Sequence, residues 1–155
     1  MVAAHVATTF TVKVDEDRFL SPVRFLNGRF DCKVSGRDTG GALCVFDTLR
    51  TSRGGPPLHI HPYQDEWFLV QHGEFRFQIG DELHLLKAGD SIFGPRKVPH
   101  AFVNLSETGR LLIAFQPAGT MEAFFAAGLL DPMSEEFRQL NREHGIEVVG
   151  PPLPI

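Results

Sequence analysis

Three histidines and one glutamate form the densest group of potential metal ligands in the sequence. His59 and His61 are separated by one residue, Glu66 follows after a short turn, and His100 lies further along the chain. If the histidine pair lies on a strand, both imidazoles point to the same face, because alternate side chains of a strand share a face. Three neutral imidazoles and one carboxylate suit a divalent first-row transition metal, and an octahedral ion would keep two positions open. The histidine pair alone is weak evidence, since this spacing is common by chance.

The elements that must position these residues are short and resemble strands. The 155-residue chain has 15 Gly and 11 Pro, scattered between segments rich in Val, Phe, Leu and Thr. Turn signals at such short intervals predict about ten antiparallel strands, and they leave no room for the crossover helices of a parallel sheet. The sequence therefore predicts an all-β sandwich or barrel. The expected strands are 6–14, 23–31, 42–49, 58–60, 66–71, 74–79, 82–86, 91–93, 100–105 and 110–116.

The last part of the chain has a different pattern. Thr120 is expected to cap a short helix over 121–127. Asp131, followed by a proline, is expected to start a second helix that stops at Gly145. We expect this tail to pack on the barrel as a lid, followed by an extended arm over 146–155. The apolar stripe that would make the contact is Met133, Phe137, Leu140 and His144.

Composition limits the classes of function. With 43% hydrophobic and 22% charged residues and a net charge of -4, the chain does not have the cationic excess expected of a nucleic-acid-binding surface. Its apolar runs are far shorter than the ~20 residues that cross a bilayer, so we expect no membrane partner. Cys32 and Cys44 are too few for a disulfide scaffold and indicate a reduced, cytoplasmic protein. We expect a single domain over 1–155, with the barrel over 1–118 and the tail and arm over 119–155.

The potential ligands lie within two longer motifs that also fix two glycines, a proline and an asparagine. The motifs are His59-x-His61-x4-Glu66-x6-Gly73 and Gly89-x5-Pro95-x4-His100-x3-Asn104. Their order and spacing closely resemble the two signature motifs of the cupin family, and the resemblance covers residues 40–118. Two positions depart from the family pattern, since Arg53 and Lys97 stand where glycine is usual.

The resemblance implies the cupin double-stranded β-helix, a jelly-roll barrel in which His59, His61, Glu66 and His100 hold one divalent metal per subunit. The motif spacing is most similar to that of small single-domain cupins of the quercetinase-like type. Those dioxygenases use Fe, Mn, Ni or Cu, and Zn is a further candidate, because metal supply decides which ion occupies such a site. By the same resemblance, Glu66 would be both a ligand and the base that accepts a substrate proton.

Strand alternation also predicts the surroundings of this site. If the histidine pair faces the interior, alternate residues of the strands that follow face it too. The pocket would then be apolar with a metal at one end, which suits a small apolar or aromatic molecule with chelating oxygens. The predicted pocket residues are Phe68, Val70, Phe102 and Asn104.

The opposite face of the strand that carries Glu66 is also apolar, at Trp67 and Leu69. A sheet that is apolar on both faces is covered on both, by the other sheet, the tail or a second subunit. Small cupins are commonly dimers, so we expect a homodimer.

Three kinds of function remain open from the sequence. The first is a metal-dependent dioxygenase, the second a metal-dependent isomerase, decarboxylase or lyase that does not use O2, and the third a non-catalytic small-molecule binder. We favour the dioxygenase, but the fold itself does not choose among them, because this barrel supports many chemistries.

Overall fold

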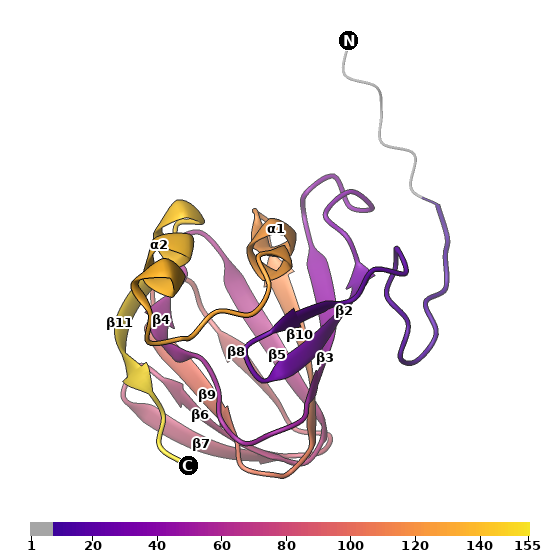
Figure 1. Cartoon of the computed structure of the whole chain (residues 1–155). Helices are drawn as coiled ribbons and strands as arrows, with labels where there is room; N and C mark the ends of the chain where they lie inside the picture. The colour runs from indigo at the N-terminus through magenta and orange to yellow at the C-terminus, as the bar shows by residue number, and fades with distance from the viewer. Residues whose placement is uncertain (1–7) are drawn as a thin grey trace.

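The computed structural model describes residues 8–155, which form two antiparallel β-sheets packed face to face, with two short helices at one end (Figure 1). The six-stranded sheet has the order β1-β2-β3-β10-β5-β8, and the five-stranded sheet has the order β11-β4-β9-β6-β7. Strands that are neighbours in a sheet are often distant in sequence, as expected of a jelly roll. The predicted all-β jelly-roll class is confirmed.

The first sheet comprises β1 (Val23–Phe25), β2 (Gly28–Val34), β3 (Cys44–Arg50), β10 (Gly109–Gln116), β5 (Asp65–His72) and β8 (Ser91–Gly94). The second comprises β11 (Glu147–Pro152), β4 (Pro57–Ile60), β9 (His100–Asn104), β6 (Glu74–Ile79) and β7 (Glu82–Lys87). The helices are α1 (Met121–Ala126) and α2 (Glu135–Glu143).

Two expected strands differ from the structure. The segment 6–14 begins among residues that lie outside the described part, and residues 8–14 are not in a strand. The segment 23–31 is not one strand but the hairpin β1–β2, whose turn has Leu26 at φ 51°. Leu26 and Asn27 form a two-residue turn, and Leu26 has the positive φ that such hairpin turns require at their first central residue.

The tail closes one end of the barrel. α1 follows Thr120 as expected, but Thr120 makes no capping hydrogen bond, and its hydroxyl lies 2.7 Å from Nδ1 of His144. The expected start of the second helix at Asp131 is wrong. Ser134 caps α2 by accepting a hydrogen bond from the Phe137 N–H, and Asp131 instead accepts one from the Met133 N–H in the preceding turn.

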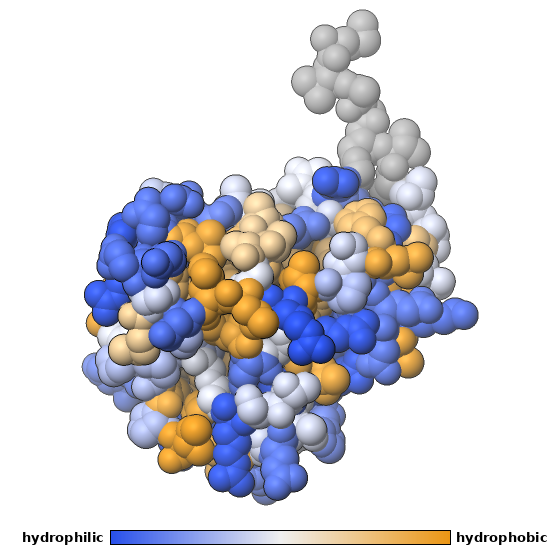
Figure 2. Space-filling model, in the orientation of Figure 1, coloured by the Kyte–Doolittle hydropathy of each residue, from blue (hydrophilic) through white to orange (hydrophobic). Residues whose placement is uncertain are grey.

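The two faces of the tail have opposite character. Phe137 of α2 is buried, whereas Met133 precedes the helix and is exposed. In Figure 2, hydrophilic residues cover the outer side of α2 at the upper left, and hydrophobic residues gather across the middle of the same face.

β11, from the expected arm, pairs with β4 and completes the five-stranded sheet. The tail therefore contributes both to the closed end of the barrel and to one of its sheets.

The core is built largely from phenylalanine. Phe125 of α1 lies among five other phenylalanine rings, with ring centroids 4.6 to 5.8 Å away. These partners come from the first sheet and from α1 itself, so α1 is part of the core and not an appendage. No helix in residues 8–155 is long and apolar enough to cross a membrane.

This packing predicts the cost of truncating Phe125. Phe125→Ala should lower the free energy of unfolding by about 3–5 kcal/mol, because it removes a buried ring and leaves a cavity. Leu85→Ala is a matched control, since Leu85 is 58% exposed on β7, and it should change stability by less than about 0.5 kcal/mol. Urea denaturation followed by circular dichroism measures both. Equal effects of the two substitutions would mean that the tail is not part of the cooperative core.

Candidate metal centre

The four predicted ligands come from both sheets and meet at one end of the barrel. His59 lies on β4, His61 directly follows that strand, and His100 begins β9, where it is the register partner of His59. Glu66 lies on β5 of the other sheet. The strands thus bring three imidazoles from one wall toward a carboxylate on the opposite wall.

The four side chains are close enough to share one ion. Their potential ligand atoms all lie within 4.8 Å of one another. Nε2 of His61 is 3.3 Å from Oε2 of Glu66, and Nε2 of His100 contacts the same oxygen. His61, Glu66 and His100 are buried, and His59 is partly exposed.

Each imidazole is oriented by an acceptor on its other nitrogen. Nδ1 of His59 lies 2.7 Å from the Pro57 carbonyl oxygen. Nδ1 of His61 lies 3.3 Å from Oε1 of Gln64, and Nδ1 of His100 lies 3.2 Å from the Val98 carbonyl oxygen. The two carbonyl groups can only accept, so the Nδ1–H groups of His59 and His100 donate, and the same assignment suits His61. The three Nε2 lone pairs then face the shared centre, which is the tautomer that metal-binding histidines use.

The electrostatics of the site also favour a cation. Burial by itself raises the pKa of Glu66, but the neighbouring His61 and His100 outweigh it and lower this pKa to about 2. Burial and the nearby imidazoles lower the pKa of His59 to about 3, and burial lowers that of His61. Burial opposes the charged form of His100, but the contact with Glu66 outweighs it and raises the pKa of His100. The carboxylate and two of the imidazoles thus already have the protonation state that a metal ion requires.

Two atoms of the cluster lack the partners that a metal would provide. Oε2 of Glu66 and Nε2 of His100 are buried, and neither makes a hydrogen bond of normal geometry with any group in residues 8–155. Buried polar atoms without partners are costly and call for an explanation. Three nitrogen donors and one carboxylate oxygen, aimed at a common point, fit a divalent transition metal.

Comparison with known proteins agrees with this arrangement. Residues 47–115, which carry all four ligands, match the family described as Cupin domain. The part of the chain that holds the site is therefore similar to a cupin domain. A curated relative, Protein SchB from Streptomyces halstedii, is 31% identical over 77 residues. That match covers 48% of this chain and 56% of the relative, so it spans only about half of either protein.

Solved structures of other proteins share the cupin fold at low sequence identity. KdgF from Halomonas sp. is 17% identical, with a TM-score of 0.62 over 72% of this chain and 94% of that one. An RmlC-like cupin from Shewanella frigidimarina is 19% identical, with a TM-score of 0.60 over 72% of this chain and 93% of that one. Oxalate decarboxylase from Bacillus subtilis, which has Mn(II) centres, is 21% identical with a TM-score of 0.61, over 76% of this chain and 32% of that one. These matches establish the fold.

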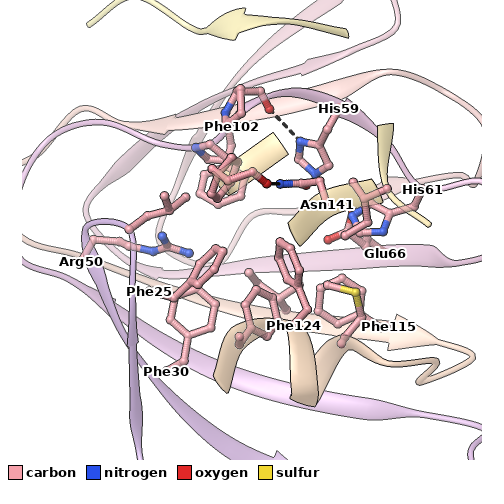
Figure 3. A pocket seen from close by; sticks show the side chains of 18 residues that line it. Phe25, Phe30, Arg50, His59, His61, Glu66, Phe102, Phe115, Phe124 and Asn141 are labelled. Atoms are coloured by element: carbon pink, nitrogen blue, oxygen red, sulfur yellow. Dashed lines mark hydrogen bonds and ion pairs between the residues drawn. The ribbon is translucent and has the colours of Figure 1, made fainter. Parts of the chain in front are cut away.

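The four-ligand site opens into an interior cavity of about 50 Å³ (Figure 3). Three of the ligands, His59, His61 and Glu66, line it, and most of the remaining lining is apolar. One wall belongs to the tail and the loop that follows it. The lining residues from this wall are Met121, Phe124, Phe125, Phe137, Asn141 and Ile146.

The predicted pocket residues all face the interior, but only one of them lines the cavity. Phe102 is in the lining. Phe68 and Val70 are fully buried and lie outside it, with the Phe68 ring packed against those of Phe77 and Phe102. Asn104 donates hydrogen bonds to the carbonyl oxygens of Ser52 and Ser106, and it thereby connects the loop after β3 to the loop after β9. Alternation identifies the inner face, but phenylalanine rings fill the barrel beyond the ligands, so facing inward is not enough to reach the cavity.

The two departures from the cupin motifs have local explanations. Lys97 adopts the left-handed φ of 69° that glycine usually provides, and its N–H donates to the His61 carbonyl oxygen over 2.9 Å. Near Arg53, the close approach is made by Gly55, where a Cβ would collide with the Phe102 carbonyl oxygen. The backbone around the site is thus kept despite both substitutions.

Sequence reasoning missed the tail residues of the cavity and one charged residue, Arg50 at the end of β3. Arg50 lines the cavity and is 1% exposed. A signal was present, because Arg50 continues the inward alternation of Cys44, Phe46 and Thr48 and is the only charged residue in that series.

The geometry predicts that His61 is needed for metal binding. His61→Ala should lose stoichiometric metal, because it removes one of three imidazole donors. His84→Ala is the matched control, since His84 lies on β7 and pairs with Glu82 at the surface, and it should retain the metal. Elemental analysis of both proteins after loading and gel filtration makes the comparison. Full metal retention by His61→Ala would exclude this site.

Proposed function

We propose that this cupin binds one divalent transition metal per subunit and is a dioxygenase for a small apolar or aromatic molecule with chelating oxygens. The observation that carries the proposal is the meeting of the four-ligand cluster with an apolar cavity. When bound, the metal would supply Lewis acidity and open coordination positions for substrate oxygens. Fe, Mn, Ni, Cu and Zn all suit the donor set.

The chain's own residues would have three tasks in this reaction. The histidines hold the cation, the phenylalanine walls exclude water, and Glu66 accepts the proton of the substrate's enol or phenol group. Its low pKa makes Glu66 a weak base, so it accepts a proton only from an acidic hydroxyl group, and a bound cation would supply that acidity. O2 is the oxidant. A carbon–carbon bond of the substrate and the O–O bond break, both oxygen atoms bond to carbon, and the proton returns to the product, so no external reductant is needed.

The size of the cavity favours a second candidate as well. A space of about 50 Å³ holds a few water molecules, whereas pockets for drug-sized ligands measure roughly 300 Å³ or more. A large aromatic substrate would therefore require movement of the tail, and little room is left for O2 beside a small one. A metal-dependent isomerase, decarboxylase or lyase acting on a small enolisable substrate needs no such room.

One assay distinguishes these functions. Metal-loaded protein is mixed with a panel of small diketones, catechols and a flavonol, while O2 uptake and substrate loss are recorded together. A dioxygenase consumes one O2 per substrate molecule. Substrate loss without O2 uptake would support the isomerase or lyase, and tight binding without turnover would indicate a non-catalytic binder.

The role of Glu66 can be tested in the metal-loaded protein. If Glu66 is also the base, loaded Glu66→Gln should bind substrate but turn it over about 10²-fold more slowly or worse. Glu82→Gln changes an exposed carboxylate on β7 and is the matched control. Equal turnover by loaded wild type and Glu66→Gln would leave Glu66 as a ligand only.

We also propose that the protein is a cytoplasmic homodimer. Trp67 and Phe93 are register partners on β5 and β8 and are 38% and 56% exposed on the outer face of the six-stranded sheet. Leu69 and Leu112, also register partners, extend this apolar surface. A second copy would cover it. The two cysteines are free and buried, which supports a reducing compartment.

The dimer proposal predicts that a charge in this surface separates the subunits. Trp67→Glu should convert a dimer into a folded monomer in light scattering after gel filtration, because the charge would have to lose its hydration at the interface. Leu85→Glu, on the outer face of the other sheet, should remain dimeric. Monomeric wild type at all concentrations would refute the proposal.

A further inference from the structure

The cavity contains a charged group that the proposed reaction does not use. Arg50 ends β3 with its side chain in the interior, and its strand neighbours in register are Gly28 and Gly109. A Cβ at Gly28 would lie 3.2 Å from Cδ and 3.3 Å from Nε of Arg50. The glycine on β2 thus leaves the space that this side chain occupies.

The guanidinium of Arg50 is held in place but not neutralised. Its Nε donates to Oγ1 of Thr48 over 3.3 Å, and its Nη1 donates to Oδ1 of Asn27 over 3.1 Å. The rings of Phe30 and Phe102 lie 4.9 and 5.0 Å from its central carbon. None of the ion pairs in residues 8–155 includes Arg50.

One nitrogen of this guanidinium group has no hydrogen-bond partner within the described residues. Nη2 of Arg50 is buried and makes no hydrogen bond within residues 8–155. Burial lowers the pKa of Arg50 to about 9, so the group remains charged at neutral pH. A buried charge with an unmade hydrogen bond destabilises a fold, and an anion that accepts this hydrogen bond would compensate both the charge and the free donor.

The position of Arg50 relative to the metal ligands indicates what the anion belongs to. Arg50 and the ligands His59, His61 and Glu66 line the same cavity. Figure 3 shows Arg50 on one side and these ligands on the other, with phenylalanine rings between them. A molecule that enters this cavity therefore has both the cation and three of the metal ligands among the groups that line it.

We propose that Arg50 binds the carboxylate of the substrate, so that the substrate is a small organic acid whose enol, keto or phenol oxygens face the metal ligands. A carboxylate is planar and accepts two hydrogen bonds, which matches the remaining donors of a guanidinium. This inference rests on the proposed function for the orientation of the substrate, but the anion site itself does not depend on metal or on turnover.

The test uses two pairs of molecules, and the members of each pair have nearly the same shape. 3,4-Dihydroxybenzoate has chelating oxygens at one end and a carboxylate at the other, and 4-methylcatechol replaces that carboxylate with a methyl group. 2,4-Dioxopentanoate and pentane-2,4-dione form a smaller pair, with the carboxylate next to the chelating oxygens. Binding is measured by calorimetry on wild type, Arg50→Met, Arg50→Lys and the control Arg24→Met, whose arginine is exposed on β1.

Wild type and Arg24→Met should bind the acid of at least one pair roughly 30-fold or more tightly than its neutral analogue. Arg50→Met should lose this preference, and Arg50→Lys should keep only part of it, because lysine has the charge without the planar fork. Arg50→Met should also unfold at the same or a higher temperature than wild type, since it removes an uncompensated buried charge. A structural role for Arg50 would instead lower that temperature.

Equal affinity of wild type for both members of each pair would overturn the proposal, whatever the variants do. A preference that survives in Arg50→Met would overturn it as well. Acetate alone is the third arm: if it binds as tightly as the preferred acid, Arg50 holds a separate small anion and not the substrate. Repeating the acid titration on metal-free protein separates the two claims, because an Arg50-dependent preference that persists there stands even if metal binding fails.

Discussion

The buried charge of Glu66 is the constraint around which this barrel is organised. An ionised carboxylate that is 4% exposed needs a compensating partner, because burial alone would raise its pKa and neutralise it. His61 and His100 provide that compensation from the opposite sheet. A divalent cation would provide it more completely, since it would also satisfy the buried atoms that lack good hydrogen bonds. The two sheets must therefore hold these side chains in register for the interior to be stable.

The second feature of the design is the way the C-terminal tail completes the site. α1 supplies the phenylalanine that joins the core of the first sheet, α2 closes the open end, and β11 pairs with the strand that carries His59. The helices of the tail belong to the core and also line the cavity. Access to the site therefore depends on how stably these helices are packed. The limited volume of the cavity follows from this arrangement, and so does the expectation that a larger ligand can enter only if the helices shift.

How far the sequence predicted this structure depends on how local each signal was. The shared face of His59 and His61, at the end of β4, and the inward face of β9 follow from strand alternation, which needs only the backbone geometry of one strand. The break at Asn27 was misjudged because the apolar residues on both sides hid a turn signal between them. The start of α2 was misplaced because Asp131 and Ser134 are both competent caps, and only the packing of Phe137 chooses between them. Phe68 and Val70 were placed on the correct face, but how deeply rings fill a barrel depends on partners distant in sequence. Arg50 was missed for the same reason, because its meaning depends on a cavity lined by residues from Phe25 to Ile146 that are distant in sequence.

The central claim is that three imidazoles and Glu66 bind one metal ion at the edge of the cavity. Anomalous diffraction from crystals of the metal-loaded protein tests it most directly. We expect a single strong peak about 2.0–2.2 Å from Nε2 of His59, His61 and His100 and from a Glu66 carboxylate oxygen. A peak elsewhere, coordination through Nδ1, or no peak at this position in fully loaded crystals would mean that these four residues do not form the metal site.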